Sequence, residues 1–376
     1  MLAKRPPMGW NSWNTFAENI SEQLIFEMAD AMVEKGYLAA GYEYLVIDDC
    51  WAKMERDENG RLAADPEKFP HGMKAVADYV HSKGLKFGMY SCAGIRTCAG
   101  YPSSYDHEFI DAQTFADWGV DFLKYDFCNF PAVGNCRARY HRMSMALKAT
   151  GREILFSACN WGVEEPWKWM RAIGAHMYRS TGDIVDNYKS FKDIAISQID
   201  NLCMSGPGSF NDPDMLIVGM YGKGHVGFGG CSDLEYRTHF ALWCLFGVPL
   251  MMGGDIRSLT PQSEALLKNP ALIAIDQDEE CRAPYLVDSR EDRYLFIRHL
   301  SGGEFVLAYF NFNDEPARSW RFSGCFDDIG LPYDCGYGLH LTDVFTGEDL
   351  GVKRDAFYPS IEPHGCQMYR ARLEKI

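Results

Sequence analysis

A chain of 376 residues exceeds a typical single small domain and can hold one large domain followed by a smaller one. Its formal net charge of −15 argues against nucleic acid or an anionic membrane surface as a partner, because both bind clustered Lys and Arg. No segment approaches the run of about 18 apolar residues that a membrane span needs, so we expect no membrane partner either.

At the amino terminus, residues 1–10 read MLAKRPPMGW and contain no apolar stretch of signal-peptide length. The sequence as written therefore predicts a cytoplasmic protein. The thirteen cysteines are an odd number without paired Cys-x-x-Cys spacing, so we predict neither a zinc site nor a complete disulfide framework. Most of them are expected to be buried thiols.

Short apolar runs then alternate with longer amphipathic segments that each close on a glycine. The first amphipathic segment places Leu24, Met28, Met32 and Val33 on one predicted helical face, and Gly36 supplies the stop. After an opening strand that ends near Trp13, the predicted strands are YEYLVIDD (42–49), KFGMYSC (86–92), DFLKYD (121–126), EILFSACN (153–160), AHMYRSTGD (175–183), SFNDPDM (209–215) and VPLMMGGD (248–255).

With the opening segment, these runs give eight strand candidates before about residue 290, as a closed (β/α)8 TIM barrel requires. An open doubly wound sheet is the alternative. It would ordinarily carry a Gly-rich phosphate loop after a strand, and neither a G-x-G-x-x-G nor a Walker pattern occurs. We therefore predict a catalytic barrel over residues 1–288 that uses no cofactor.

After about residue 290 the pattern changes to strands separated by turns. The predicted strands are RYLFIRHL (293–300), EFVLAYFNF (304–312), ARSWRFS (317–323), HLTDVFTGE (340–348) and CQMYRARL (366–373). These runs predict an antiparallel β-sandwich domain over residues 289–376.

Polar side chains end nearly every predicted barrel strand, and active sites of α/β barrels lie at those carboxyl ends. In chain order they are Asp48, Asp49 and Trp51; Tyr90; Lys124 and Asp126; Asn160 and Trp161; Arg179 and Asp183; Asp212, Asp214 and Met215; and Asp255. A lone Asp after a strand is more often a helix cap, but that interpretation weakens when six strands show the pattern. Carboxylates that converge with aromatic rings suit a sugar. They also suit a hard metal, yet no loop has EF-hand spacing and no phosphate cradle accompanies them, so we expect no metal.

Asp126 and Asp183 are the candidates for catalysis. Strand alternation points Lys124 to the same side as Asp126, so that an ammonium lies beside the carboxylate and keeps it ionised, as a nucleophile requires. Gly182 permits an unusual backbone beside Asp183, and Arg179 could bind a sugar hydroxyl or hold a carboxylate. In glycosidases, two catalytic carboxyl groups about 5 to 5.5 Å apart give retention of the anomeric configuration, and groups about 6.5 to 9.5 Å apart give inversion. The sequence alone does not determine this distance.

Around these residues the sequence resembles glycoside hydrolase family 27, the family of α-galactosidases and α-N-acetylgalactosaminidases. The shared motifs are PPMGWNSWN (6–14), YLVIDDCW (44–51), GLKFGMYSCAGIRTCAGYPSSYDHEFIDAQTFADWGVDFLKYDFC (84–128), NDPDML (211–216) and ALWCLFGVPLMMGGDIRSL (241–259). Together they cover nearly the whole predicted barrel. The resemblance implies a retaining exo-glycosidase that releases terminal α-linked galactose from an oligosaccharide or glycoconjugate by double displacement.

The resemblance also implies roles for single residues. Asp126 matches the nucleophile and Asp183 the general acid/base. Trp13 matches the sugar-stacking ring, and Asp48 and Asp49 match the acceptors for O4 and O6. The other implied pocket residues are Tyr90, Cys98, Lys124, Asn160, Arg179, Asp214 and Met215. In many relatives a disulfide joins the cysteines that match Cys98 and Cys128, and whether this chain forms it stays open.

Two positions depart from the family pattern. Asn160 stands where galactosidases commonly carry Glu, at the position that faces the C2 substituent of the sugar, and its amide could bind a 2-hydroxyl. Glu18 stands where relatives usually carry the disulfide partner of the cysteine that matches Cys50, so we predict a free thiol at Cys50.

α-N-Acetylgalactosaminidase or β-L-arabinopyranosidase activity is the alternative within the family. Asp49, rather than a longer Glu, favours a sugar with a C6 hydroxymethyl group. A non-catalytic carbohydrate-binding barrel is the alternative from another class, and the presence of both Asp126 and Asp183 argues against it. The natural aglycone and the formation of a homo-oligomer stay open.

Overall fold

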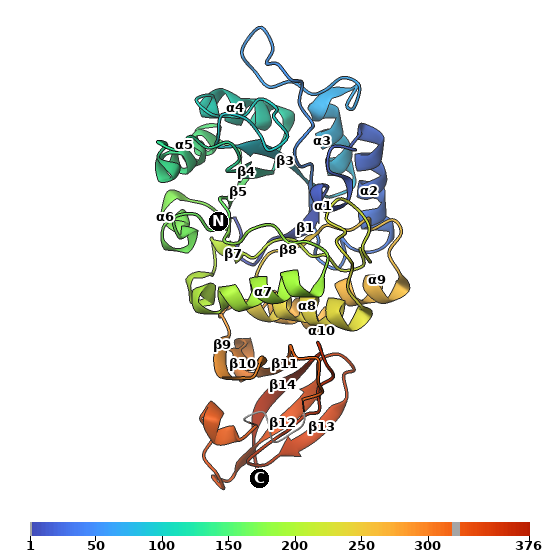
Figure 1. Cartoon of the computed structure of the whole chain (residues 1–376), viewed down its shortest axis with the longest axis vertical. Helices are drawn as coiled ribbons and strands as arrows, with labels where there is room; N and C mark the ends of the chain where they lie inside the picture. Colours follow the sequence, from blue (N-terminus) through green and yellow to red (C-terminus); the bar gives the residue numbers. More distant parts are fainter. Residues whose placement is uncertain (1, 318–323) are drawn as a thin grey trace.

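The computed structural model describes residues 2–317 and 324–376, and its larger part is a ring of eight parallel strands (Figure 1). The strands are β1 (Met8–Asn11), β2 (Tyr44–Val46), β3 (Lys86–Cys92), β4 (Phe122–Asp126), β5 (Leu155–Cys159), β6 (Met177–Arg179), β7 (Phe210–Asp212) and β8 (Leu250–Met252). They pair in the order β7-β6-β5-β4-β3-β2-β1-β8, and Leu216, shortly after β7, pairs with Met252 in β8, so the ring closes. The predicted (β/α)8 barrel is confirmed.

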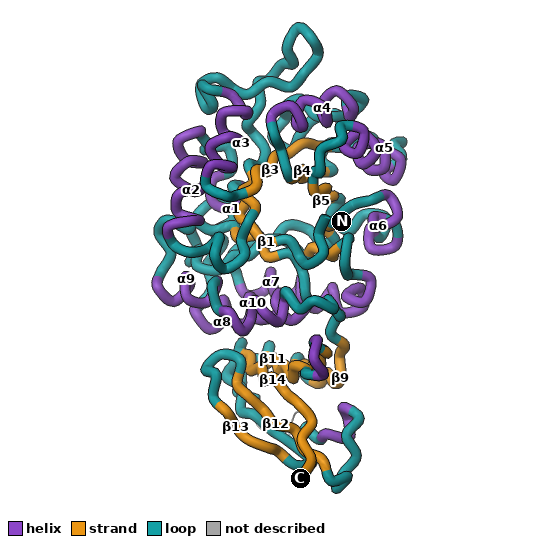
Figure 2. The backbone as a smooth tube through the Cα atoms, turned by 180° about the vertical axis from the view of Figure 1, so that it is seen from behind, coloured by secondary structure: helices purple, strands orange, loops and turns teal. Residues whose placement is uncertain are grey.

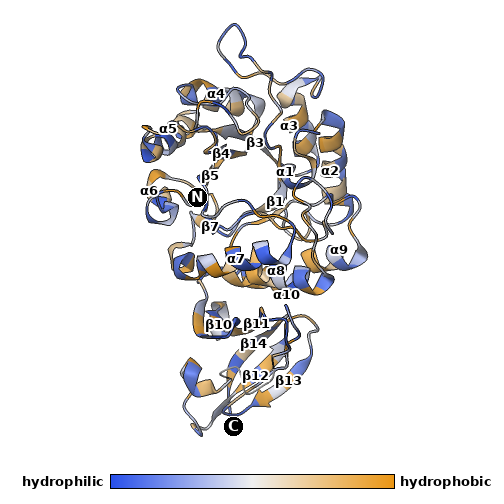
Figure 3. Ribbon diagram, in the orientation of Figure 1, coloured by the Kyte–Doolittle hydropathy of each residue, from blue (hydrophilic) through white to orange (hydrophobic). Residues whose placement is uncertain are grey.

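Helices surround this ring (Figure 2). They are α1 (Trp13–Phe16), α2 (Glu22–Glu34), α3 (Gly72–Ser82), α4 (Glu108–Trp118), α5 (Cys136–Ala149), α6 (Met170–Ile173), α7 (Tyr188–Gln198), α8 (Asp233–Phe246), α9 (Pro261–Leu267) and α10 (Pro270–Asp276), with the 3-10 helices η1 (Pro166–Lys168) and η2 (Ile199–Met204). Two further 3-10 helices, η3 (Ser301–Gly303) and η5 (Phe326–Ile329), belong to the smaller part of the molecule. Apolar and polar stripes lie side by side on these helices (Figure 3). Within the described residues, no helix combines the length and the apolar character that a membrane crossing requires.

Helix α2 shows how local sequence sets these elements. The Ser21 hydroxyl accepts a hydrogen bond from the Leu24 backbone N–H at 3.2 Å and caps the helix. Leu24, Met28 and Met32 are buried in the core, as the pattern predicts. Val33 is 39% exposed, so its assignment to the same face was wrong. It follows Met32 by one residue and is therefore rotated by about 100° around the helix axis.

The observed barrel strands are shorter than several of the predicted ones. In particular, β2 covers three residues of the predicted run 42–49, so that Asp48 and Asp49 lie beyond its carboxyl end. Within β4, alternate side chains point to opposite sides: Phe122 packs inside the ring, whereas Leu123 packs against the helices. The same alternation turns Lys124 and Asp126 toward the ring's interior, as predicted.

The smaller part of the molecule is a six-stranded antiparallel sheet in the order β13-β12-β14-β11-β10-β9. Its strands are β9 (Tyr285–Arg290), β10 (Arg293–His299), β11 (Phe305–Asn311), β12 (Tyr337–Asp343), β13 (Asp349–Lys353) and β14 (Cys366–Lys375). One face, with Phe296 and Val306, packs on the barrel, and the other, with Leu295 and Leu307, forms a core of its own. The predicted antiparallel β domain is confirmed. The boundary between residues 288 and 289 stays a prediction, and that position falls inside β9.

Two of the strands predicted in this domain are not confirmed over their full length. The predicted strand 340–348 consists of the second half of β12 and a turn, because the Asp343 carboxylate accepts hydrogen bonds from the backbone of Phe345 at 2.8 Å and Thr346 at 2.9 Å. Of the predicted strand 317–323, all but Ala317 lies outside the described residues.

Arg298 of β10 joins the sheet to the barrel. Its side chain is fully buried, and its guanidinium donates to the backbone oxygens of Cys244 at 2.8 Å and Leu245 at 3.0 Å. A third bond, at 3.4 Å, goes to the backbone oxygen of Asp276. The last carbonyls of a helix have no partner within the helix, so Arg298 satisfies groups at the end of α8 that burial would otherwise leave unpaired.

Candidate active site

A cavity with about 520 Å³ of empty space, part of it open to solvent, lies at the carboxyl ends of the barrel strands. It is lined by Trp13, Asn14, Asp48, Asp49, Tyr90, Cys98, Lys124, Asp126, Trp161, Arg179, Asp183, Asp214, Met215 and Val226. The structure thus brings together eleven of the twelve residues predicted for the site, and Asn160 is the exception. Five carboxylates and two cationic side chains line the cavity, which suits a neutral substrate better than an anionic one.

Asp126 occupies the buried part of the cavity. It is the last residue of β4, and its side chain is only 5% exposed. One carboxylate oxygen, Oδ1, accepts a hydrogen bond from the Phe127 backbone N–H at 2.8 Å. Burial raises the pKa of Asp126 above its ordinary value, although Lys124 and this hydrogen bond act in the opposite direction.

Lys124 forms its hydrogen bond with Asp48 rather than with Asp126. Its ammonium donates to Asp48 Oδ2 at 2.8 Å, and Asn11 Nδ2 donates to the same oxygen at 2.8 Å. Burial disfavours the charged Lys124, but Asp48 and Asp126 outweigh burial and raise its pKa above the ordinary value. The ammonium therefore favours the ionised form of Asp126 through space, but its hydrogen bond is with Asp48.

Two backbone N–H groups hold the Asp49 carboxylate, and the Thr97 side chain also hydrogen-bonds to it. Oδ1 accepts from the Cys50 N–H at 2.7 Å and Oδ2 from the Ala99 N–H at 2.9 Å. Each carboxylate oxygen offers about two acceptor sites, so Asp49 keeps capacity for the hydroxyls of a ligand. Burial raises the pKa of Asp49, an effect that both backbone bonds oppose.

Arg179, at the end of β6, binds two carboxylates. Its Nη2 lies 2.7 Å from Asp183 Oδ1 and 2.5 Å from Asp214 Oδ2. The two partners differ in exposure: the Asp183 side chain is 73% exposed, whereas that of Asp214 is 5% exposed. Desolvation opposes ionisation of Asp183, but Arg179 and Lys124 outweigh it and hold the pKa of Asp183 below its usual range.

Asp214 is more constrained than its partner. Its Oδ2 also accepts from the Ile184 backbone N–H at 2.7 Å, and its Oδ1 accepts from the Met215 N–H at 2.7 Å. Burial raises the pKa of Asp214 above its ordinary value, and Arg179 acts in the opposite direction by favouring its charged form. Because Ile184 directly follows Asp183, Asp214 fixes both the backbone next to Asp183 and the guanidinium that binds it.

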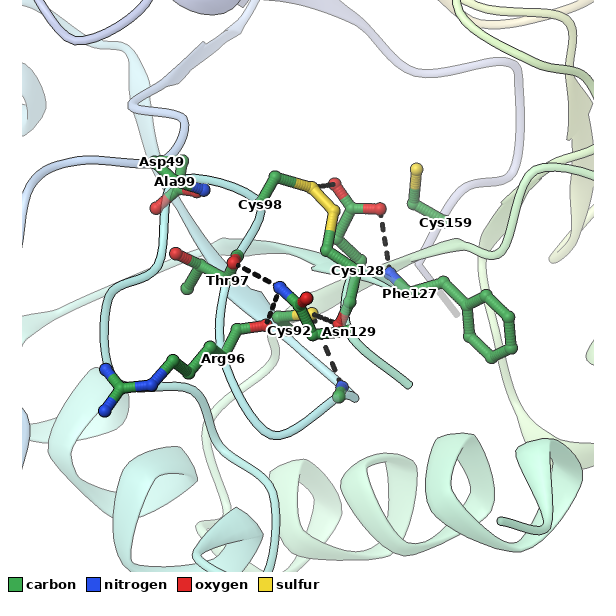
Figure 4. The surroundings of a disulfide bond; sticks show 12 residues. Asp49, Cys92, Arg96, Thr97, Cys98, Ala99, Phe127, Cys128, Asn129 and Cys159 are labelled. Atoms are coloured by element: carbon green, nitrogen blue, oxygen red, sulfur yellow. Dashed lines mark hydrogen bonds between the residues drawn. A yellow bond between two sulfur atoms is a disulfide. The ribbon is translucent and has the colours of Figure 1, made fainter. Parts of the chain in front are cut away.

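A disulfide between Cys98 and Cys128 forms part of the cavity wall, with the two Cα atoms 5.0 Å apart (Figure 4). The pairing left open by the sequence is therefore present. Asn129 Nδ2 donates to the Thr97 backbone oxygen at 2.9 Å, so the loop that carries Cys98 is also held by hydrogen bonds. Cys50 is a free thiol, as predicted, and eight of the eleven free cysteines are buried.

Two groups of side chains among the described residues have three potential metal-ligand atoms within 4.8 Å of one another. The first consists of Cys98, Asp126 and Cys128, whose two sulfurs are joined to each other as a disulfide. The second, Cys325, Asp327 and Asp328, lies in the sheet domain, and both of its aspartates are exposed.

Asn160 does not line the cavity. Its side chain is fully buried, and its Nδ2 donates to the backbone oxygen of Val163 at 2.5 Å. Trp161, the next residue, is 37% exposed and lines the cavity instead. The sequence had marked Trp161 as a strand-end residue without assigning it to the site.

Asn14 and Val226 are also cavity residues that sequence reasoning missed. Asn14 lies within the motif 6–14, so the motif itself was an available signal. Val226 belongs to a Gly-rich loop with no strand pattern. The backbone N–H of Asp186 donates to the Val226 backbone oxygen at 2.8 Å, and this distant contact left no local signal in the sequence.

Comparisons with known proteins match both parts of the chain. A family profile described as "Alpha galactosidase A" matches residues 5–278, and one described as "Alpha galactosidase C-terminal beta sandwich domain" matches residues 291–371. The α-galactosidase of Cyamopsis tetragonoloba is 41% identical over 369 residues, which cover 98% of this chain and 86% of the relative. α-Galactosidase A of Cellvibrio japonicus is 43% identical over 388 residues, covering 98% and 92%.

Solved structures share the whole architecture. α-Galactosidase I from Mortierella vinacea superposes with a TM-score of 0.92 at 34% identity, covering 98% of this chain and 97% of that one. The Saccharomyces cerevisiae α-galactosidase with raffinose gives a TM-score of 0.89 at 28% identity, covering 99% and 98%. A β-L-arabinopyranosidase from Geobacillus stearothermophilus shares the fold at 24% identity, with a TM-score of 0.86 and coverage of 98% and 97%.

Proposed function

The chain belongs to glycoside hydrolase family 27, the α-galactosidase family, and we propose that Asp126 is its nucleophile and Asp183 its general acid/base. The chain is a glycoside hydrolase with α-galactosidase activity, and the resemblance predicted from its motifs is confirmed. The assignment of the two roles depends on the geometry of the cavity.

One observation supports this assignment above the others: the two carboxylates line one cavity but differ in exposure. Asp126 is buried, whereas Asp183 lies where the cavity opens. A terminal sugar enters with its aglycone toward solvent, so the exposed carboxyl group faces the leaving oxygen and the buried one faces the sugar's C1. In the first step Asp126 attacks C1 and Asp183 gives its proton to the leaving oxygen. In the second, a water molecule attacks C1 and releases the Asp126 carboxylate, while Asp183 takes the proton that this water loses.

The free cavity favours an ionised Asp183, because Arg179 holds its pKa low. A general acid must be protonated, so substrate binding has to supply part of this protonation. The aglycone displaces water from the exposed Asp183 and thereby disfavours its charge. Activity that declines as the pH rises is the expected consequence.

The remaining predicted residues fit a galactose-sized ligand. Asp48 and Asp49 are fixed acceptors with free lone pairs, and the partly exposed Trp13 also lines the cavity. We infer that galactose-terminated oligosaccharides such as raffinose, the ligand of the yeast structure, are substrates. A cytoplasmic location, glycoconjugate substrates and a homo-oligomer stay predictions.

The test is a comparison of turnover on nitrophenyl α-galactoside, α-N-acetylgalactosaminide and β-L-arabinopyranoside, with the Asp126→Ala protein as control. We expect the α-galactoside to be hydrolysed fastest, and Asp126→Ala to lose at least about 10⁴-fold in kcat with an unchanged melting temperature. A faster rate on either of the other two sugars would show that hydrolysis of that sugar is the main activity of the enzyme. Equal rates for the wild type and Asp126→Ala would contradict the nucleophile assignment.

A further inference from the structure

The turn after β5 contains an unusual run of left-handed backbone. The φ angles are +57° at Trp161, +84° at Gly162, +58° at Glu164 and +54° at Glu165. This conformation is unfavourable for residues with a side chain, and for a bulky one such as Trp it is a genuine outlier. Strained positions persist only where neighbouring contacts hold them. The contacts of this turn therefore determine where Trp161 lies.

Asn160 closes the turn with both its main chain and its side chain. Its backbone oxygen accepts from the Val163 N–H at 3.0 Å, and its Nδ2 donates to the Val163 oxygen at 2.5 Å. Within the described residues, its Oδ1 is buried without a hydrogen-bond partner. An unpaired buried oxygen is unfavourable, so the side chain is not explained by packing alone.

Contacts with β6 and with Trp169, the residue before α6, hold the rest of the turn. The Gly162 N–H donates to the backbone oxygen of Arg179 at 3.3 Å, and Trp169 Nε1 donates to the Glu164 oxygen at 2.9 Å. A Cβ at position 162 would lie 2.5 Å from the Ser180 oxygen, so only glycine fits there. The turn is thus packed directly beside the strand that carries Arg179.

The Trp161 ring reaches from this turn to the nucleophile's neighbour. It contacts the Phe127 ring edge to face, with 5.9 Å between the ring centroids, and Phe127 stacks on Phe130 at 4.5 Å. Phe127 also donates its backbone N–H to Asp126. The ring therefore forms a wall of the cavity next to Asp126.

We propose that Asn160 is a positioning residue, which holds the Trp161 ring against the cavity and makes no contact with the sugar. The inference rests on the proposed function, because the ring acts on a bound galactoside. It replaces the expected role of Asn160 as a partner of the sugar's 2-hydroxyl. An aromatic wall binds the apolar face of a sugar, so its displacement weakens substrate binding more than bond cleavage.

The test combines Asn160→Ala, Trp161→Ala and the double variant, each assayed on nitrophenyl α-galactoside and on its 2-deoxy analogue. For Asn160→Ala we expect a rise in KM of roughly tenfold with kcat within about threefold of wild type. The preference for the 2-hydroxyl substrate over the 2-deoxy substrate should not change. In the Trp161→Ala background, Asn160→Ala should add less than about twofold, because both changes remove one wall.

Two results would overturn the positioning role: a loss confined to the 2-hydroxyl substrate, or effects of the two changes that multiply in the double variant. If Asn160→Ala does not fold, Asn160→Asp is the test variant. It keeps the size and shape of the side chain but removes the Nδ2 donor to Val163. A wild-type KM in Asn160→Asp would show that the bond to Val163 does not hold the ring. Wild-type protein no faster than Asp126→Ala would instead overturn the proposed function.

Discussion

Arg179 and Arg298 are both buried guanidinium groups, one in the cavity and one between the barrel and the sheet. Arg179 binds Asp183 and Asp214, and their charges outweigh the effect of burial and raise its pKa. Arg298 binds backbone oxygens, and burial lowers its pKa. Carboxylates exchange protons and carbonyls do not. The charge around Arg179 can therefore change with pH or with a bound substrate. The contacts of Arg298 at the interface do not change in this way.

The largest effect expected from this comparison is the loss of Asp183. Asp183→Ala should lower kcat/KM on galactosides with a sugar leaving group by about 10³-fold, because acid assistance is lost, and should spare nitrophenyl substrates in the step that cleaves the glycosidic bond. The measurement is kcat/KM on both substrate types, with the melting temperature as the control. Equal losses on both would show that Asp183 does not protonate the leaving group.

At the interface, Arg298→Leu should affect stability and leave chemistry alone. The variant leaves the carbonyls of Cys244 and Leu245 buried without a donor, so we expect a loss of about 3 kcal/mol in the free energy of unfolding. Urea unfolding measures this loss, and kcat of the folded enzyme should remain within about twofold of wild type. A large fall in kcat at full folding would mean that the interface acts on the cavity.

Asp214→Asn tests whether the shared guanidinium couples the two carboxylates. Removal of the Asp214 charge leaves Arg179 with Asp183 alone, and loss of a nearby anion lowers the pKa of Asp183. Since the acid acts when protonated, activity should be lost at a lower pH than in the wild type. We expect kcat/KM near neutral pH to fall by roughly tenfold on substrates with sugar leaving groups. An unshifted pH profile would contradict the coupling.

The smallest predicted effect concerns His239 on α8, the barrel helix that also contacts β14 of the sheet domain. Its Nε2 accepts from the Ile217 backbone N–H at 3.2 Å, and burial lowers its pKa to about 3. The unfolded chain binds a proton below about pH 6.5, which the folded protein cannot, so stability falls as the pH drops from about 6.5 toward 3. The loss by pH 5.5 is about 1 kcal/mol.

His239→Gln keeps an acceptor for Ile217 without a titrating ring and should flatten that part of the stability profile. The measurement is the free energy of unfolding in urea from pH 7 to 5.5 for both proteins. Parallel profiles would show that other groups determine the acid sensitivity. Activity at pH 7 should be the same in both, because His239 does not line the cavity.

The barrel and most of its site were predictable because the pattern is local. Each strand is a short apolar run, and the residue that ends it must lie at the carboxyl edge of the ring. Asp48, Asp126 and Arg179 therefore followed from position in the sequence together with the geometry of the barrel. The second domain was predictable for the same reason, through alternation along β10, β11 and β14.

The parts that were not predictable depend on contacts between distant segments or on unusual backbone angles. The direction of Asn160 follows from a left-handed turn, which no pattern of apolar residues encodes. Val226 reaches the cavity through its hydrogen bond with Asp186. Lys124 of β4 binds Asp48, which follows β2, across the intervening strand β3, and alternation along one strand cannot reveal this contact.

The closure of the ring adds a property that none of the single residues has. The ring closes where Leu216, shortly after β7, pairs with β8. The Leu216 N–H donates to the Met251 backbone oxygen at 2.7 Å, and Asp214 and Met215 lie between the end of β7 and Leu216. A local opening of the barrel between β7 and β8 therefore also displaces Asp214 and Met215 and disrupts this side of the substrate cavity. If the bound sugar contacts Asp214, as the proposed site predicts, it links the two sides of this junction, and we expect substrate to protect the barrel against local unfolding and proteolysis.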